Sequence, residues 1–88
     1  MDDECEHMLS VPVPEPPAAT DGCEECLAIG QTWFHLRKCL TCGHVGCCDQ
    51  SKGKHATKHA HATGHPVIRS FQPHEDWRFC YADDTFAE

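Results

Sequence analysis

The stretch from Cys23 to His65 concentrates side chains that bind soft metal ions. Six cysteines and six histidines lie within it. Proteins hold Zn²⁺ with thiolate sulfur and imidazole nitrogen, and two thiolates separated by two residues can close on one tetrahedral ion from a single turn. The pairs Cys23-x2-Cys26 and Cys39-x2-Cys42 have this spacing. The stretch therefore predicts structural zinc sites.

The pairs alone do not fix how the ligands are shared between sites. The ligands that follow the pairs in the sequence are Cys47, His55, His59 and His65. In one partition the two pairs form an all-cysteine site and the later ligands form a second site. In the other, each pair joins later ligands, so that each zinc ties the front of the segment to a helix. Spacing does not choose between these partitions.

The eight cysteines of this 88-residue chain could also form disulfides, which would require an oxidising compartment. A domain this short buries little apolar surface and needs additional cross-links, such as disulfides or bound metal ions. The first ten residues, MDDECEHMLS, are acidic and lack the basic and apolar regions of a signal peptide. A disulfide framework does not require the eight histidines of this chain, whereas metal binding uses histidine as a ligand. We expect zinc sites, a cytoplasmic location and no membrane span.

The charge of the chain argues against nucleic acid as a partner. The formal net charge is −7, whereas phosphate binding depends on an excess of lysine and arginine. The acidic residues gather near both ends, and between Cys26 and His74 six basic residues accompany one acidic residue, Asp49. A protein or peptide partner is therefore favoured over nucleic acid.

Local patterns predict the elements that must position these ligands. Lys54–Thr63 is alanine-rich and followed by Gly64, which predicts a helix with His55 and His59 on one face. A short helical or irregular stretch is expected from Cys23 to Gly30. Alternating or β-branched residues predict strands at 32–39, 45–48, 66–71 and 77–82. The predicted class is α+β, a small zinc-stabilised domain with a twisted antiparallel sheet and one or two short helices.

Composition divides the chain into four regions. Residues 1–9 form an N-terminal segment, and the proline-rich residues 10–21 are expected to form an extended tether. Residues 22–84 form the zinc domain, and residues 85–88 are expected to be a C-terminal tail.

The cysteine and histidine spacing, together with Trp33, His65-Pro66 and a closing aromatic-Cys-Tyr, resembles the ubiquitin-specific-protease type of zinc finger, the UBP finger. The resemblance covers about residues 22–84. It implies the interleaved partition. The first zinc would then be held by Cys23, Cys26, Cys47 and His55, and the second by Cys39, Cys42, His59 and His65.

Members with several zinc ions also carry a third site, made from an N-terminal Cys-x-His and a C-terminal Cys-x2-Cys. Cys5 and His7 match the first half, and Cys80 matches the start of the second. Asp83 stands where the last cysteine would be, and carboxylate oxygen is an accepted zinc ligand. We therefore expect a third, weaker zinc held by Cys5, His7, Cys80 and Asp83; the alternative is a frayed terminus with two free thiols.

The resemblance also implies a slot beside the zinc sites that receives the free carboxy-terminal Gly-Gly of ubiquitin. Trp33, Phe79 and Tyr81 would form its walls. An arginine two residues after the third cysteine pairs with the terminal carboxylate in the family, and Asp49 occupies that position here. Aspartate repels a carboxylate, so a slot lined by Asp49 should prefer a ligand with a cation or hydrogen-bond donors.

The chain has three arginines, Arg37, Arg69 and Arg78, and all lie on predicted strands. They are alternative sources of the cation that position 49 lacks. Cys48 is expected to be a buried free cysteine, and the alternative is that Cys48 replaces Cys47 as the zinc ligand. His35, His44, His61 and His74 are expected to be surface or packing residues.

The sequence thus predicts a non-catalytic zinc-binding interaction module that reads a short peptide or a protein C-terminus in an aromatic slot. The alternative is a purely structural or zinc-responsive protein with no peptide site. A catalytic zinc needs an open coordination position, whereas the predicted sites each have four protein ligands.

Overall fold

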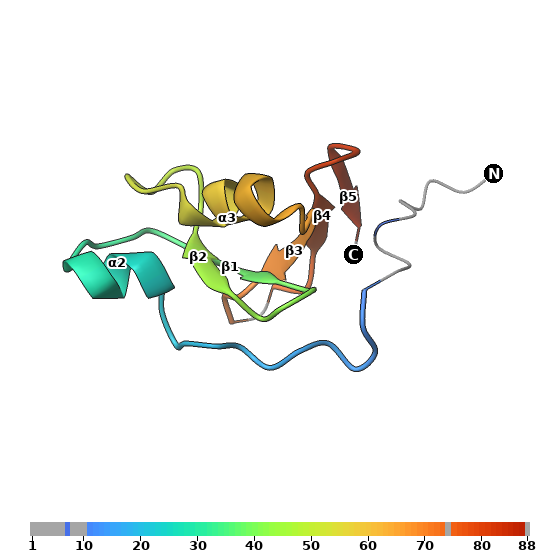
Figure 1. The fold of residues 1–88 in the computed structure, drawn as a ribbon, viewed down its shortest axis with the longest axis horizontal. Coiled ribbons are helices and arrows are strands. Elements are labelled where there is room, and N and C mark those ends of the chain that lie inside the picture. The colour runs from blue at the N-terminus through green and yellow to red at the C-terminus, as the bar shows by residue number, and fades with distance from the viewer. Residues whose placement is uncertain (1–6, 8–10, 74, 88) are drawn as a thin grey trace.

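A single antiparallel sheet with helices at its face and end forms the described part of the chain (Figure 1). The computed structural model describes residues 7, 11–73 and 75–87. The strand order is β2-β1-β3-β4-β5. The strands are β1 Leu36–Cys39, β2 Val45–Cys47, β3 Val67–Ser70, β4 Arg78–Cys80 and β5 Thr85–Ala87. The helices are α2 Glu24–Ile29 and α3 His55–Thr63. The predicted α+β class is confirmed.

Both helices end where the sequence provides a glycine. Gly30 and Gly64 adopt left-handed backbone conformations, with φ of 72° and 74°, which residues without a side chain adopt at little cost. Cys23 caps the start of α2, and its sulfur accepts a hydrogen bond from the Cys26 backbone N–H. The predicted helix at 54–63 is therefore present with nearly the expected bounds, and the stretch after Cys23 is helical.

The first strand is shorter than the alternation at 32–39 predicts. Only Leu36–Cys39 pairs with neighbours, with β2 on one side and β3 on the other. The backbone N–H of Phe34 donates to the Ser51 hydroxyl at 2.8 Å instead of to a neighbouring strand. The loop before α3 therefore takes the hydrogen bond that would have extended β1.

Residues 85–87, expected to lie in a tail, form the edge strand β5 and pair with β4. The Phe86 ring packs against Phe79, with centroids 4.8 Å apart, and against Trp77 at 5.5 Å. Aromatic cross-strand pairs of this kind stabilise short strands. The acidic residues around Phe86 led to the prediction of a tail, so the sequence did not indicate this strand.

The apolar core is small and is divided into two clusters. One consists of Leu40, Val67 and Cys80. The other combines Leu36 and Val45 with candidate zinc ligands, Cys23, Cys26 and Cys47. Because so much of the buried surface belongs to thiols, the fold depends on what those thiols bind.

The proline-rich segment is extended, as expected, but it packs against the domain. It crosses the side of the sheet opposite α3 (Figure 1). The Glu15 carboxylate lies 2.6 Å from Lys38 Nζ and 3.2 Å from Arg69 Nη1, and the Ala19 N–H donates to the Gly43 carbonyl at 2.9 Å. We call residues 11–20 the strap. Among the described residues, no helix is long and apolar enough to cross a membrane.

Candidate metal centres and aromatic slot

Three thiols and one imidazole converge where α2, β2 and α3 meet. The Nδ1 atom of His55 lies 3.3 Å from the Cys23 sulfur and 3.4 Å from the sulfurs of Cys26 and Cys47. The Cys26 and Cys47 sulfurs are 3.9 Å apart. A tetrahedral zinc places two thiolates about 3.8 Å apart and a thiolate and an imidazole nitrogen about 3.5 Å apart. This group, which we call site 1, fits one zinc ion.

Tight backbone packing brings His55 to site 1. The His55 backbone N–H donates to the Cys47 sulfur at 3.2 Å, so a ligand of the site also receives a hydrogen bond from the first residue of α3. A side chain at Gly53 would collide with the His55 ring. Glycine at 53 is therefore required by the close approach of this loop to the imidazole.

A second group, which we call site 2, lies at the other end of α3. The Cys42 sulfur is 3.4 Å from His59 Nε2, and the Cys39 sulfur is 3.7 Å from His65 Nδ1. The ligand atoms of all four residues lie within 4.8 Å of one another. Cys42 is exposed and Cys39 is buried, so site 2 is more open to solvent than site 1. This arrangement also fits one zinc ion.

The structure therefore brings together the interleaved sets and not the all-cysteine set. Site 1 combines the first CxxC pair with Cys47 of β2 and His55 of α3, and site 2 combines the second pair with ligands from α3 and the chain after it. Each site ties the front of the domain to that helix. Cys48, beside the ligand Cys47, belongs to neither group. The Cys48 sulfur lies 3.5 Å from the Ser51 hydroxyl.

Two thiols of site 1, those of Cys26 and Cys23, have raised pKa values in this fold. Burial, followed by the neighbouring Cys23 and Cys47 thiols, raises the pKa of Cys26 to about 12. The pKa of Cys23 is also raised, again chiefly by burial. Zinc must therefore displace protons to form thiolates here. Cys48 differs, because hydrogen bonds from Ser51, Gln50 and His35 outweigh burial and lower its pKa to about 7.

A third group consists of His7, Cys80 and Asp83. The His7 Nδ1 atom lies 3.3 Å from the Asp83 carboxylate, and Cys80 is buried at the end of β4. Cys5, the fourth expected ligand, lies outside the described residues. The three described members could hold a zinc ion together with one further ligand.

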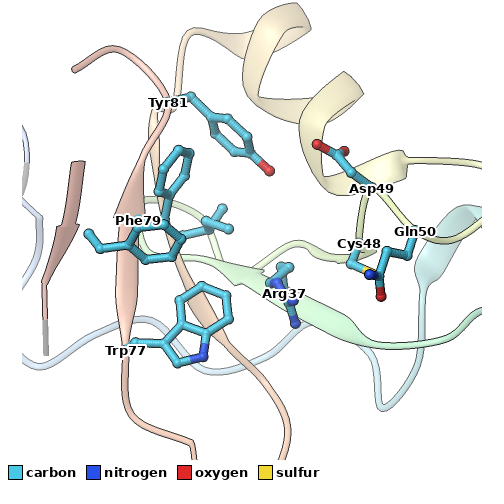
Figure 2. A pocket seen from close by; sticks show the side chains of 9 residues that line it. Arg37, Cys48, Asp49, Gln50, Trp77, Phe79 and Tyr81 are labelled. Carbon is cyan, nitrogen blue, oxygen red and sulfur yellow. The ribbon is translucent and has the colours of Figure 1, made fainter. Parts of the chain in front are cut away.

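A cavity of about 300 Å³ opens beside site 1, and we call it the slot. Figure 2 shows Trp77, Phe79 and Tyr81 forming one wall, with the turn that carries Asp49 opposite. Arg37 of β1 lies between these walls. The slot thus combines flat aromatic surface with one basic and one acidic side chain.

The expected slot residues do not all meet. Phe79, Tyr81 and Asp49 line the cavity, whereas Trp33 packs against the cluster of site 1 and against Gly22. Trp77 supplies the additional aromatic wall. The signal for Trp77 was available, because residues 77, 79 and 81 alternate along one predicted strand and share a face.

Arg37 is the arginine that reaches the slot. Its guanidinium carbon lies 4.5 Å from the centre of the Trp77 ring, and its Nη1 donates to the Leu36 carbonyl at 2.9 Å. Among the described residues it makes no ion pair. Arg69 instead binds Glu15 of the strap on the other side of the sheet.

Asp49 is held at the edge of the slot by α3. The Thr57 hydroxyl donates to the Asp49 carboxylate at 2.5 Å and lies 3.0 Å from the Tyr81 hydroxyl. Burial raises the pKa of Tyr81, and the negative charge of Asp49 contributes in the same direction. Tyr81 therefore stays protonated and can donate a hydrogen bond.

The part of this chain that matches a known protein family contains both candidate zinc sites and the slot. A family model described as "Zn-finger in ubiquitin-hydrolases and other protein" matches residues 23–88. The BRCA1-associated proteins of Mus musculus and Homo sapiens are each 33% identical over 70 residues, which is 80% of this chain and 11% of their own length. The solution NMR structure of protein RPA1320 from Rhodopseudomonas palustris has a TM-score of 0.89 and 50% identity, and the match covers 100% of this chain and 84% of that one.

Proposed function

This chain belongs to the family of UBP-type zinc fingers, and on that premise we propose that it is a non-catalytic interaction module that binds a short peptide or chain terminus in the slot. The observation that carries the proposal is the guanidinium of Arg37, which lines an aromatic-walled cavity and makes no ion pair with any other described residue. The relatives span far more sequence than this chain, so the proposal concerns this domain alone.

Both zinc sites support a structural role for the metal. Each candidate site already supplies four protein ligands of cysteine and histidine. Zinc bound in this way cross-links the fold and leaves no open position for a substrate or an activated water. The metal would therefore position the walls of the slot and take no part in chemistry.

The shape of the slot suits a chain segment with small side chains. Its volume of about 300 Å³ is at the lower end for ligand cavities, which favours a short chain segment. The flat faces of Trp77, Phe79 and Tyr81 can pack against peptide planes without selecting a large side chain. Glycine-rich termini are therefore the favoured ligands.

Arg37 and Asp49 would bind different groups of the ligand. A terminal carboxylate would face Arg37, because a guanidinium binds carboxylate with two parallel hydrogen bonds. The backbone N–H groups that precede the carboxylate would donate to Asp49. In this arrangement Asp49 meets hydrogen-bond donors, as its charge demands, and Arg37 supplies the cation that position 49 lacks.

The test is a fluorescence titration that reports on Trp77. Because the chain has two tryptophans, the Trp33→Phe variant leaves Trp77 as the sole indole. Glycine-terminated peptides would be added with a free carboxylate, with an amidated terminus, and with an amine in place of the carboxylate. We expect the free carboxylate to bind at least about tenfold more tightly than the amide, as for a charge-assisted contact.

Two variants check which residue provides the selectivity. Arg37→Ala should remove the preference for carboxylate, whereas the matched control Arg78→Ala, outside the slot lining, should retain it. Equal binding of carboxylate and amide, or preference for the amine, would contradict the assignment of Arg37. If none of the three peptides binds, the purely structural or zinc-responsive function is favoured instead.

A further inference from the structure

His44 is a buried histidine that belongs to neither zinc site, yet it touches a ligand of one of them. It lies just before β2, and 8% of its surface is exposed. Its ring stacks on His59 of site 2, with centroids 3.9 Å apart and planes within 5° of parallel. His59 in turn directs Nε2 at the Cys42 sulfur. The orientation of this ligand is therefore supported by a flat neighbour.

Glu25 connects His44 to the other site. It lies in α2 between the two site 1 ligands Cys23 and Cys26. Its carboxylate oxygens are 2.7 and 2.9 Å from His44 Nε2, and one of them is 3.9 Å from the Cys23 sulfur. His44 Nε2 is thus the protonated nitrogen that donates to the carboxylate.

We propose that Glu25 and His44 couple the two metal sites, so that metal bound at either site strengthens binding at the other. Metal at site 1 fixes the turn around Cys23 and therefore the position of the Glu25 carboxylate. The carboxylate fixes the plane of His44, and that ring presents His59 to Cys42 before the second metal arrives. His44 acts as a positioning residue, comparable to the groups that orient metal ligands through hydrogen bonds.

The coupling must be reciprocal, because a change in affinity at one site caused by the other is a shared free energy. The backbone provides a second route, since α3 carries both His55 of site 1 and His59 of site 2. Substitution of Glu25 or His44 should therefore remove only part of the cooperativity, and that part measures their contribution. We expect it to be about tenfold, within the usual range for coupled sites.

Native mass spectrometry of the full chain during titration with Zn²⁺ measures this coupling. For two independent sites, at least half of the protein carries one metal at half saturation, and the fraction is larger when the two affinities differ. We expect the one-zinc form of the wild-type chain to stay well below half. In His44→Ala the one-zinc form should become the dominant species at one equivalent of zinc. His61→Ala is the matched control, because His61 is exposed, lies in the same helix as His59 and belongs to neither site.

Two gentler variants separate coupling from general damage to the fold. His44→Phe keeps a flat ring against His59 but cannot bind Glu25, and Glu25→Ala removes the carboxylate while leaving His44 in place. Both should raise the one-zinc fraction. If these variants weaken both sites but leave the one-zinc fraction as in the wild type, His44 and Glu25 are merely structural and the proposal is overturned. An unchanged titration overturns it as well.

Discussion

The sulfur atoms of Cys26 and Cys47 lie 3.9 Å apart although 21 positions separate them in the sequence. This is the spacing of two thiolates on one tetrahedral zinc. The contact joins α2 to β2 inside the buried cluster that also contains Leu36 and Val45. The position of α2 therefore depends on the metal site as well as on apolar packing.

Removal of zinc should unfold the domain. Structural zinc contributes an apparent free energy of about 10–16 kcal/mol per site, whereas a core of this size supplies about 3–5 kcal/mol. We expect amide signals in an NMR spectrum to lose their dispersion when excess chelator is added, and to recover it when Zn²⁺ is restored. A dispersed spectrum in excess chelator would show that the apolar core suffices.

Substitution of single ligands should have a similar effect. Cys26→Ala removes a thiolate from site 1, and His59→Ala removes an imidazole from site 2. Each leaves a three-ligand site in a fold that depends on both metals, so both variants should fail to give a cooperative thermal transition. His61→Ala changes an exposed residue of the same helix and should shift the midpoint by no more than a few degrees. A folded His59→Ala variant would contradict this dependence.

Metal binding should weaken as the pH falls. Thiols are protonated at neutral pH in the unfolded metal-free chain, where the pKa of cysteine is about 8.5. Burial in the fold raises the pKa of Cys26 to about 12, so zinc must displace the proton of this thiol. Each proton released per zinc changes the apparent affinity by about tenfold per pH unit. Site 1 has three thiols and one imidazole, and site 2 has two of each. Between about pH 6.5 and about pH 8.5, where free imidazoles are neutral and free thiols are protonated, site 1 should therefore release more protons and lose zinc more steeply as the pH falls. Calorimetry in buffers of different ionisation enthalpy counts these protons.

The third group predicts a third, weaker zinc ion. Native mass spectrometry should show three zinc ions at high metal concentration, and Asp83→Ala should reduce the number to two. Asp84→Ala is the matched control, because Asp84 is adjacent, acidic and outside the group. If only two zinc ions bind and Cys5 is freely alkylated at saturating zinc, the third site is not formed.

The sequence predicted the parts of this fold that depend on local pattern. The α3 helix follows from its alanines and from Gly64, and the slot wall formed by Phe79 and Tyr81 lies on the predicted strand. The two sets of zinc ligands implied by the resemblance also converge in space. Ligand spacing alone could not choose these sets, because many foldings bring thiols to imidazoles.

The parts that were missed depend on contacts between distant elements. Arg37 reaches Trp77 because β1 and β4 both pair with β3, on opposite sides of it, and this strand order is not encoded in either strand. Trp33 fitted the resemblance, but its ring fills the space above Gly22. The strap looked like a tether because its prolines exclude regular structure, whereas its docking depends on the charge of Glu15 against two strands.

Docking of the strap should depend on Glu15. Burial opposes the ionisation of this carboxyl, but the hydrogen bond and charge of Lys38, followed by those of Arg69, lower its pKa below the ordinary value of 4.5. A lowered pKa stabilises the fold at every pH above the ordinary value, and this contribution is lost only as the pH falls through the lowered value. Glu15→Gln should therefore leave the buried ammonium of Lys38 without its anion.

We expect Glu15→Gln to lower the free energy of unfolding by about 1–3 kcal/mol, as for a buried charged group that loses its partner. Urea unfolding at saturating zinc measures the change, which should be equal at about pH 6 and about pH 8 because both lie above the window of loss. Asp21→Asn, an exposed acidic residue just after the strap, is the control and should be nearly neutral. Equal stability of Glu15→Gln and wild type would mean that the strap is held by its other contacts, which include the hydrogen bond from Ala19 to Gly43 and the apolar contacts of Val11 and Ala18.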